Sequence, residues 1–299
     1  MSSNGKYFHR TAFLGCPGAS KSTCGLSYPG VEQHVFGSSE EDTALNFPHR
    51  SDILKPVKLD WFDCLTDAEK AKFSDEKVTE DEVARLTKTA RAKNIARYRR
   101  YLYQLKSDLV AGKRPELKTV FLDNGTPFCQ DFQDYVEVVF SKEFLTEQGN
   151  FNSIKFSIKY QSELTDFLRF FYSLPCHTVM SFHIAQALDE ETAARANFME
   201  DTKKGIKHAK EWQPLIYGKA KYVLAGIPTW AFYLWCEENP GQLNKYFAKL
   251  EADSANVGVA KSRIQPFDKP SKIELPNGTF YEFLEGAVQK KLAGKLAGK

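Results

Sequence analysis

The sequence predicts an α/β fold with a mainly parallel sheet, and antiparallel strands that extend one edge of it. Three observations support this. Short apolar runs alternate with helical patterns up to about residue 184. A glycine-rich turn joins the first of these runs to the start of a helix. After residue 218 several short strand-like runs follow one another closely, which predicts the antiparallel extension.

Five early apolar runs are the expected strands of the parallel part. Each is short and is bounded by polar or glycine-containing turns. The third contains Pro56, which restricts it to an edge strand or a connector. In chain order the runs are 10–14, 31–37, 52–62, 118–124 and 176–184. Aromatic-rich helical patterns at 128–140 and 162–174 lie between the last two.

A helix is expected over 79–112. Thr79 and Glu82 have the spacing of a capping box, and Gly112 ends the pattern. The helix is strongly basic, and two interpretations stay open: an amphipathic helix packed on the sheet with a solvated face, or a surface that contacts phosphates. Its cations are Arg85, Lys88, Arg91, Lys93, Arg97, Arg99, Arg100 and Lys106.

The late runs are expected as strands and turns at 218–226, 229–237, 257–267 and 272–284, and Asn277-Gly278 is a hairpin signal. We predict one domain over 1–285 that contains the basic helix as an insertion. Residues 286–299 repeat LAGK and are expected to form a frayed, low-complexity tail.

Composition restricts the function classes. The net charge of +3 is too small to indicate a nucleic-acid partner by itself. No apolar run reaches the roughly 18 residues of a membrane span, and the start lacks a signal-peptide pattern. None of the six cysteines forms a CxxC pair or a zinc-type cluster, which favours reduced thiols. A cytoplasmic protein without a membrane partner is therefore expected.

The strongest chemical signal is the segment GCPGASKST. It follows a strand and precedes a helix, as the phosphate loop GxxxxGK[ST] does, although Ser20 replaces the second glycine. In such a loop backbone N–H groups cradle phosphates, Lys21 reaches the β- and γ-phosphates, and the Ser22 hydroxyl binds Mg²⁺. The expected binding residues for ATP are Gly15, Cys16, Pro17, Gly18, Ala19, Ser20, Lys21, Ser22 and Thr23.

Two carboxylates are candidates for the remaining chemistry. Asp123 ends a buried strand downstream of the loop, where it could orient Mg²⁺ and its waters. Glu40 follows the strand next to the loop and could polarise the attacking water, although a solvated acidic turn explains Glu40 and Glu41 equally well.

The segments GCPGASKST and VFLDN, the strand that ends in His183 and above all the late segment KSRIQPF resemble the RecA superfamily. Their order and spacing are most similar to the small phage-encoded RecA-like ATPases of single-strand annealing and recombination. The resemblance covers roughly residues 8–270, but only these four short stretches are specific. It implies a RecA-like core, and the basic helix at 79–112 has no match in RecA itself.

The resemblance also implies roles for three further residues. His183 would sense the γ-phosphate, whereas a hydrogen-bonded core histidine is the structural alternative. Lys261 and Arg263 would complete the site of a neighbouring subunit in trans. Residues two apart on a strand share a face, so both cations would point to one anion. A surface pair on an edge strand remains the alternative, and Lys219 with Lys221 are a fallback for the finger.

Candidate DNA contacts follow from topology, because ligands of doubly wound sheets bind beyond the carboxyl ends of strands. The segment after His183 is lysine-rich. Aromatic side chains there or after Asp123 could stack on bases, although core packing competes for each. The candidates are Lys203, Lys204, Lys207, Lys210, Phe198, Trp212, Phe128 and Phe132.

The sequence thus predicts an ATPase that binds ATP and Mg²⁺, assembles head to tail into a ring or filament, and acts on single-stranded DNA. A single-stranded-DNA-binding protein is a further possible partner, and the compartment would be the host cytoplasm if a phage encodes the chain. Two alternatives stay open. One is a ring translocase, either a helicase or a packaging motor, and the other is an interaction protein stabilised by nucleotide without turnover.

Overall fold

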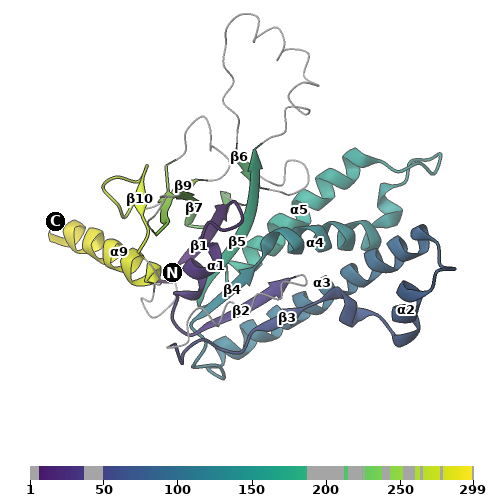
Figure 1. Ribbon diagram of the computed structural model, residues 1–299, viewed down its shortest axis with the longest axis horizontal. Helices are drawn as coiled ribbons and strands as arrows, with labels where there is room; N and C mark the ends of the chain where they lie inside the picture. Colours follow the sequence, from purple (N-terminus) through teal and green to yellow (C-terminus); the bar gives the residue numbers. More distant parts are fainter. Residues whose placement is uncertain are drawn as a thin grey trace, which may run out of the picture.

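The computed structural model describes residues 7–36, 50–186, 212–214, 224, 226–237, 243–251, 260–262, 265–276 and 279–297. Within them, one mixed sheet lies between two layers of helices (Figure 1). The expected α/β class, with a largely parallel sheet and late antiparallel strands, is confirmed.

The strands of the parallel part are β1 (Arg10–Gly15), β2 (Val31–Phe36), β3 (Val57–Leu59), β4 (Thr119–Asp123), β5 (His177–Gln186) and β7 (Trp230–Glu237). They lie side by side in the order β7-β1-β5-β4-β2-β3, and every neighbouring pair is parallel. Consequently their carboxyl ends meet at one edge of the sheet, which is where ligands bind in folds of this kind.

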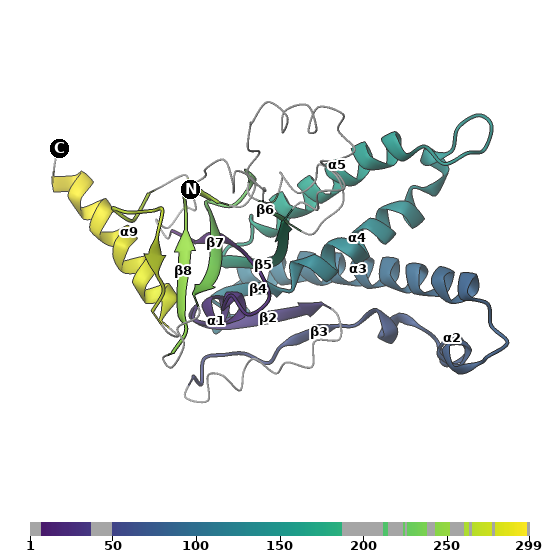
Figure 2. The ribbon, with the colours of Figure 1, turned by 45° about the horizontal axis from the view of Figure 1, so that its top comes forward.

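Four strands add antiparallel pairs: β6 (Trp212–Pro214), β8 (Lys245–Lys249), β9 (Lys261–Ser262) and β10 (Ile273–Glu274). β6 pairs with β5, β8 and β9 both pair with β7, and β10 pairs with β8. The extension expected at one edge therefore forms beside β7 (Figure 2).

The helices are α1 (Lys21–Leu26), α2 (Asp67–Ala71), α3 (Glu80–Val110), α4 (Gly125–Val139), α5 (Ser153–Phe171) and α9 (Phe280–Ala297). Short 3₁₀ turns occur at Trp61–Cys64, Lys72–Ser74 and Ser141–Phe144. One apolar core joins α3, α4 and α5 to the sheet, and a second joins α1 and α9 to its opposite face. The helices α3, α4 and α5 also project well beyond the sheet (Figure 2).

Several local predictions can be compared with these elements. β3 begins directly after Pro56 and is an edge strand, as one of the two alternatives required. α3 fills the expected helix, and the Thr79 side chain accepts a hydrogen bond from the Glu82 backbone. Gly112 follows the helix with a φ of 68°.

The expected hairpin around Asn277-Gly278 is wrong in its second half, because α9 starts at Phe280. The reason lies in the spacing of Phe280, Leu284 and Val288, which recur every four residues and are all buried in the core beside α1. The segment expected as a frayed tail from residue 286 is therefore helical as far as Ala297.

Candidate functional site

The loop between β1 and α1 lies at the carboxyl edge of the sheet. β1 lies between β5 and β7, and Gly15 is in register with His183 on one side and Leu234 on the other. A Cβ atom on Gly15 would lie 2.6 Å from the carbonyl oxygen of Leu234. Only glycine therefore allows β7 to pass so close to the start of the loop.

The loop contains two residues in the left-handed backbone region. Gly18 has a φ of 78°, and Ser20 has a φ of 59° with a ψ of 23°. Ser20 stands where the phosphate-loop pattern has its second glycine, so this chain keeps the backbone conformation without the permissive residue. A non-glycine residue in that region costs on the order of 1 kcal/mol.

Lys21 begins α1 and is directed back over the loop. Its side chain is buried, and Nζ donates hydrogen bonds to the carbonyl oxygens of Gly15 at 2.9 Å and Cys16 at 2.7 Å. Burial lowers the pKa of Lys21 to about 8, while the nearby Asp123 carboxylate acts in the opposite direction. The ammonium group is thus charged in most molecules at pH 7, and it is held beside the loop.

Asp123 is the last residue of β4 and is 8% exposed. Its Oδ2 accepts a hydrogen bond from Gln33 Nε2 at 2.9 Å, and its Oδ1 accepts one from the Ser181 hydroxyl. Both donors are neutral. Within the described part of the chain no ion pair joins Asp123 to Lys21, so the carboxylate and the ammonium group remain separate charges in one site.

His183 completes this group from β5. Burial lowers the pKa of its imidazole, the Lys21 charge lowers it further, and Asp123 opposes both effects. The His183 backbone N–H donates to the Thr126 hydroxyl at 2.9 Å. Its Nδ1 is buried and has no hydrogen-bond partner in the described residues. Lys21, Asp123 and His183, which come from three distant segments, thus lie together at the carboxyl edge.

The remaining predicted residues are placed only in part. Glu40, Arg263, Lys219 and Lys221 lie outside the described residues. The backbone of Lys261 is in β9, opposite Ala231 of β7, which precedes the register partner of Gly15 by three residues. This amounts to about 10 Å along the sheet and about 10 Å across two strands.

Two of the candidate stacking residues are core residues instead. Phe128 and Phe132 of α4 are fully buried and pack against Phe167 of α5. They face the sheet because the helical period places both on the apolar side of α4. The other aromatic and lysine candidates, Phe198, Lys203, Lys204, Lys207 and Lys210, lie outside the described residues, and only the backbone of Trp212 is described.

The basic face of α3 is partly neutralised by neighbouring helices. Carboxylates of α4, α5 and α2 pair with four of its cations, as the pairs Lys88–Glu137, Arg91–Asp134, Arg99–Glu163 and Lys93–Glu69. For these four cations the structure favours helix packing over a free phosphate-binding surface. Arg85 and Arg100 are exposed.

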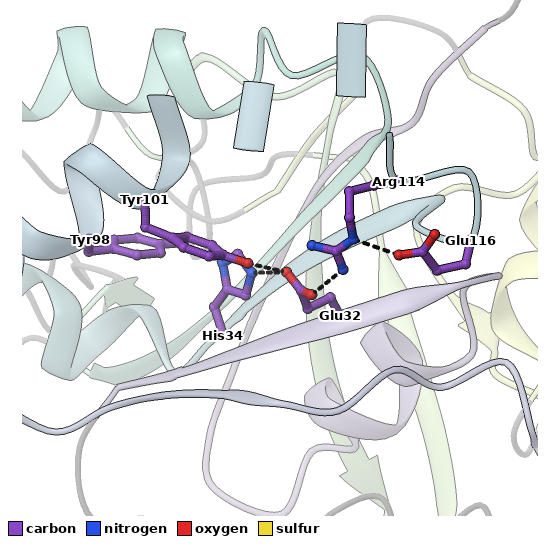
Figure 3. Close-up of polar contacts among 6 residues, drawn as sticks. All are labelled: Glu32, His34, Tyr98, Tyr101, Arg114 and Glu116. Atoms are coloured by element: carbon purple, nitrogen blue, oxygen red, sulfur yellow. Dashed lines mark hydrogen bonds and ion pairs between the residues drawn. The ribbon is translucent and has the colours of Figure 1, made fainter. Parts of the chain in front are cut away.

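A second buried polar group lies on the opposite face of β2 (Figure 3). Glu32 accepts hydrogen bonds from His34 Nε2 at 3.0 Å, from the Tyr101 hydroxyl at 2.6 Å and from Arg114 at 2.8 Å. His34 Nδ1 is hydrogen-bonded to Tyr98 at 2.8 Å. Burial opposes the charge of Glu32, but these hydrogen bonds outweigh it and lower its pKa to about 2.

Gln33, Ser181 and the residues around Glu32 belong to no motif that the sequence predicts. The sequence did contain one signal of this network, namely polar residues inside runs that are expected to be buried strands. These residues are Glu32, Gln33 and His34 in one run and Ser181 in another. Buried polar side chains need hydrogen-bond partners, so such positions indicate a network even when its members are not known.

Comparison with known proteins does not extend this description. A scan against models of protein families finds no match, and a search of the curated proteins finds none either. Within the described ranges, no helix has both the length and the apolar character to cross a membrane.

Proposed function

We propose that the chain is a RecA-like P-loop ATPase that binds ATP with Mg²⁺, assembles head to tail and acts on single-stranded DNA. The observation that carries the proposal is the gathering of Lys21, Asp123 and His183 at the carboxyl edge beside a loop with the phosphate-loop sequence. The three residues come from α1, β4 and β5, so only the folded sheet brings them together.

The donors present fit a magnesium nucleotide. Lys21 supplies a cation for the phosphates, and the Ser22 hydroxyl follows it in the first turn of α1. Asp123 accepts hydrogen bonds from the neutral donors Gln33 and Ser181, and a carboxylate held by neutral donors suits a metal ion or its water ligands. Ser22 and Asp123 would hold Mg²⁺, whose charge would offset the charge that develops on the phosphates during transfer. His183, whose Nδ1 has no hydrogen-bond partner among the described residues, is the candidate γ-phosphate sensor.

The head-to-tail assembly is proposed from the resemblance of the segment KSRIQPF to the late strand of RecA-like proteins. The backbone of Lys261 lies back from the carboxyl edge, and β9 runs antiparallel to β7. In that assembly, the phosphate partner of Lys261 and Arg263 would belong to a neighbouring subunit. Such a contact joins two different surfaces, and repeated contacts of that kind produce rings or filaments.

The DNA contact is proposed from topology. The lysine-rich segment 187–211 leaves the sheet from β5, three residues after His183, and returns through β6. DNA bound to this segment would therefore be coupled to the nucleotide site through β5.

ATP turnover with and without single-stranded DNA tests the proposal. We expect hydrolysis that single-stranded DNA stimulates and that the Asp123→Ala variant lacks. ATP binding without turnover in either condition would instead support the nucleotide-stabilised interaction protein. Unwinding of a forked duplex in the same preparation would favour the translocase over the annealing ATPase. Absence of ATP binding would contradict all three.

A further inference from the structure

The Asp123 carboxylate is held from both sides by strands that flank β4. Gln33 of β2 donates to Oδ2, and Ser181 of β5 donates to Oδ1. We propose that Gln33 and Ser181 are positioning residues, which fix the Asp123 carboxylate in the orientation that a magnesium nucleotide requires. This inference rests on the proposed function and assigns a role in it to two residues that no motif contains.

The register of the sheet explains why these two side chains meet Asp123. Gln33 is opposite Phe121, so its side chain extends along the sheet to the residue two positions further on β4. Ser181 follows Met180, which is opposite Leu122. All three polar side chains point to the face of the sheet that α1 covers, the face on which Phe13 and Phe121 pack.

The kind of donor matters as much as its position. An amide and a hydroxyl contribute hydrogen bonds but no charge, so the carboxylate keeps its full attraction for a cation. Each oxygen also retains a further lone-pair direction, because a carboxylate accepts about four hydrogen bonds in total. Gln33 is 6% exposed and Ser181 is fully buried, so neither side chain can move freely. The orientation of the Asp123 carboxylate is therefore fixed before a ligand binds.

A positioning role differs from a structural one in what it controls. If these hydrogen bonds only stabilised the fold, their removal would lower the free energy of unfolding. The dependence of nucleotide affinity on Mg²⁺ would then stay unchanged. Loss of a positioning hydrogen bond weakens the metal-dependent part of ligand affinity, and partners of metal ligands are typically worth 10- to 100-fold there. The ratio of nucleotide affinities with and without Mg²⁺ isolates this part.

The experiment measures the dissociation constant of a non-hydrolysable ATP analogue by calorimetry, once with excess Mg²⁺ and once with EDTA. Wild type is compared with Ser181→Ala, Gln33→Leu and Asp123→Asn. We expect the Mg²⁺-dependent gain in affinity to fall about 10-fold or more in both Ser181→Ala and Gln33→Leu. In the Asp123→Asn background, Ser181→Ala should cause no further loss, because its partner is already gone.

The matched control is Thr178→Val. Thr178 is another fully buried hydroxyl of β5, but it accepts from Arg10 instead of contacting Asp123. It should lower stability without changing the Mg²⁺-dependent gain. If Ser181→Ala and Gln33→Leu retain the gain of wild type, the positioning role is wrong while nucleotide binding stands. If wild type does not bind the analogue under either condition, the proposed function fails and this inference fails with it.

Discussion

Two buried carboxylates lie on opposite faces of the same part of the sheet, and they are held in opposite ways. Glu32 is surrounded by donors that include the Arg114 guanidinium, and each of its oxygens has a close partner. Among the described residues, the hydrogen-bond donors to Asp123 are the neutral side chains of Gln33 and Ser181, and Lys21 donates instead to loop carbonyls. A guanidinium thus offsets the charge of the first carboxylate, whereas no ion pair among the described residues involves the second.

One strand supplies both arrangements. Because side chains alternate along a strand, Glu32 and His34 face α3 while Gln33 faces α1. Consecutive residues of β2 thus stabilise the fold on one face and orient the candidate site on the other. A buried polar residue does not by itself indicate function. The distinction lies in whether its partners complete the charge balance.

The largest effect on stability is expected at the neutralised carboxylate. Glu32→Ala leaves His34, Tyr101 and Arg114 without their common acceptor, and removal of one partner from a buried ion pair costs about 3 kcal/mol or more. Urea unfolding should show this loss, whereas Glu116→Ala, at the exposed end of the same network, should change stability little. Equal effects of the two variants would contradict the assignment of Glu32 as the centre of the network.

The stability that Glu32 contributes should depend on pH in the acidic range. The folded-state pKa of Glu32 is about 2, below its ordinary value of 4.5, so its contribution is complete above pH 4.5 and is lost as pH falls toward 2. The difference in unfolding free energy between wild type and Glu32→Gln should shrink by about 3 kcal/mol over that range. The comparison with Glu32→Gln is needed because burial raises the pKa of Asp131 to about 7, which acts in the opposite direction. A constant difference between pH 5 and pH 2 would show that Glu32 is not stabilised in its charged form.

The smallest effect is expected at the loop. Ser20 has a left-handed backbone conformation, which is strained for a residue with a Cβ atom. Ser20→Gly removes this strain and should raise the free energy of unfolding by up to about 1 kcal/mol. Glycine has greater freedom in the unfolded chain, and this offsets part of the gain. Thermal unfolding measures the change. Because glycine is the residue that the motif normally has, nucleotide affinity should be preserved, and loss of affinity would mean that the loop does not hold a phosphate in this conformation.

The sequence was sufficient for the parts of the molecule that depend on local patterns. The loop with Ser20 in a strained position, the strand that ends in Asp123 and the long helix α3 all follow from periodicity and turn chemistry. The hairpin at residue 277 failed because a local turn signal competed with the buried spacing of Phe280, Leu284 and Val288, and the tertiary contact prevailed.

Pairings across the sheet could not be predicted in this way. Gln33 and Ser181 are 148 residues apart in the sequence, as their numbers show, and only the strand order β5-β4-β2 brings both to Asp123. Likewise, the carboxylates that pair with α3 lie on separate helices, so its basic face could not be distinguished from a free cationic surface. The pattern of one segment does not show which distant segments it will contact.

Replacement of Lys21 is the decisive test of the proposed nucleotide site at the carboxyl edge of the sheet. Calorimetry with Mg²⁺ and a non-hydrolysable ATP analogue should be performed on wild type, Lys21→Ala and Lys118→Ala, an exposed lysine before β4 that serves as the matched control. We predict binding to wild type and to Lys118→Ala, and a loss of at least about 10- to 100-fold in Lys21→Ala, because charge-assisted hydrogen bonds to the phosphates disappear. A folded Lys21→Ala variant that binds the analogue as tightly as wild type would show that this loop is not the phosphate-binding site.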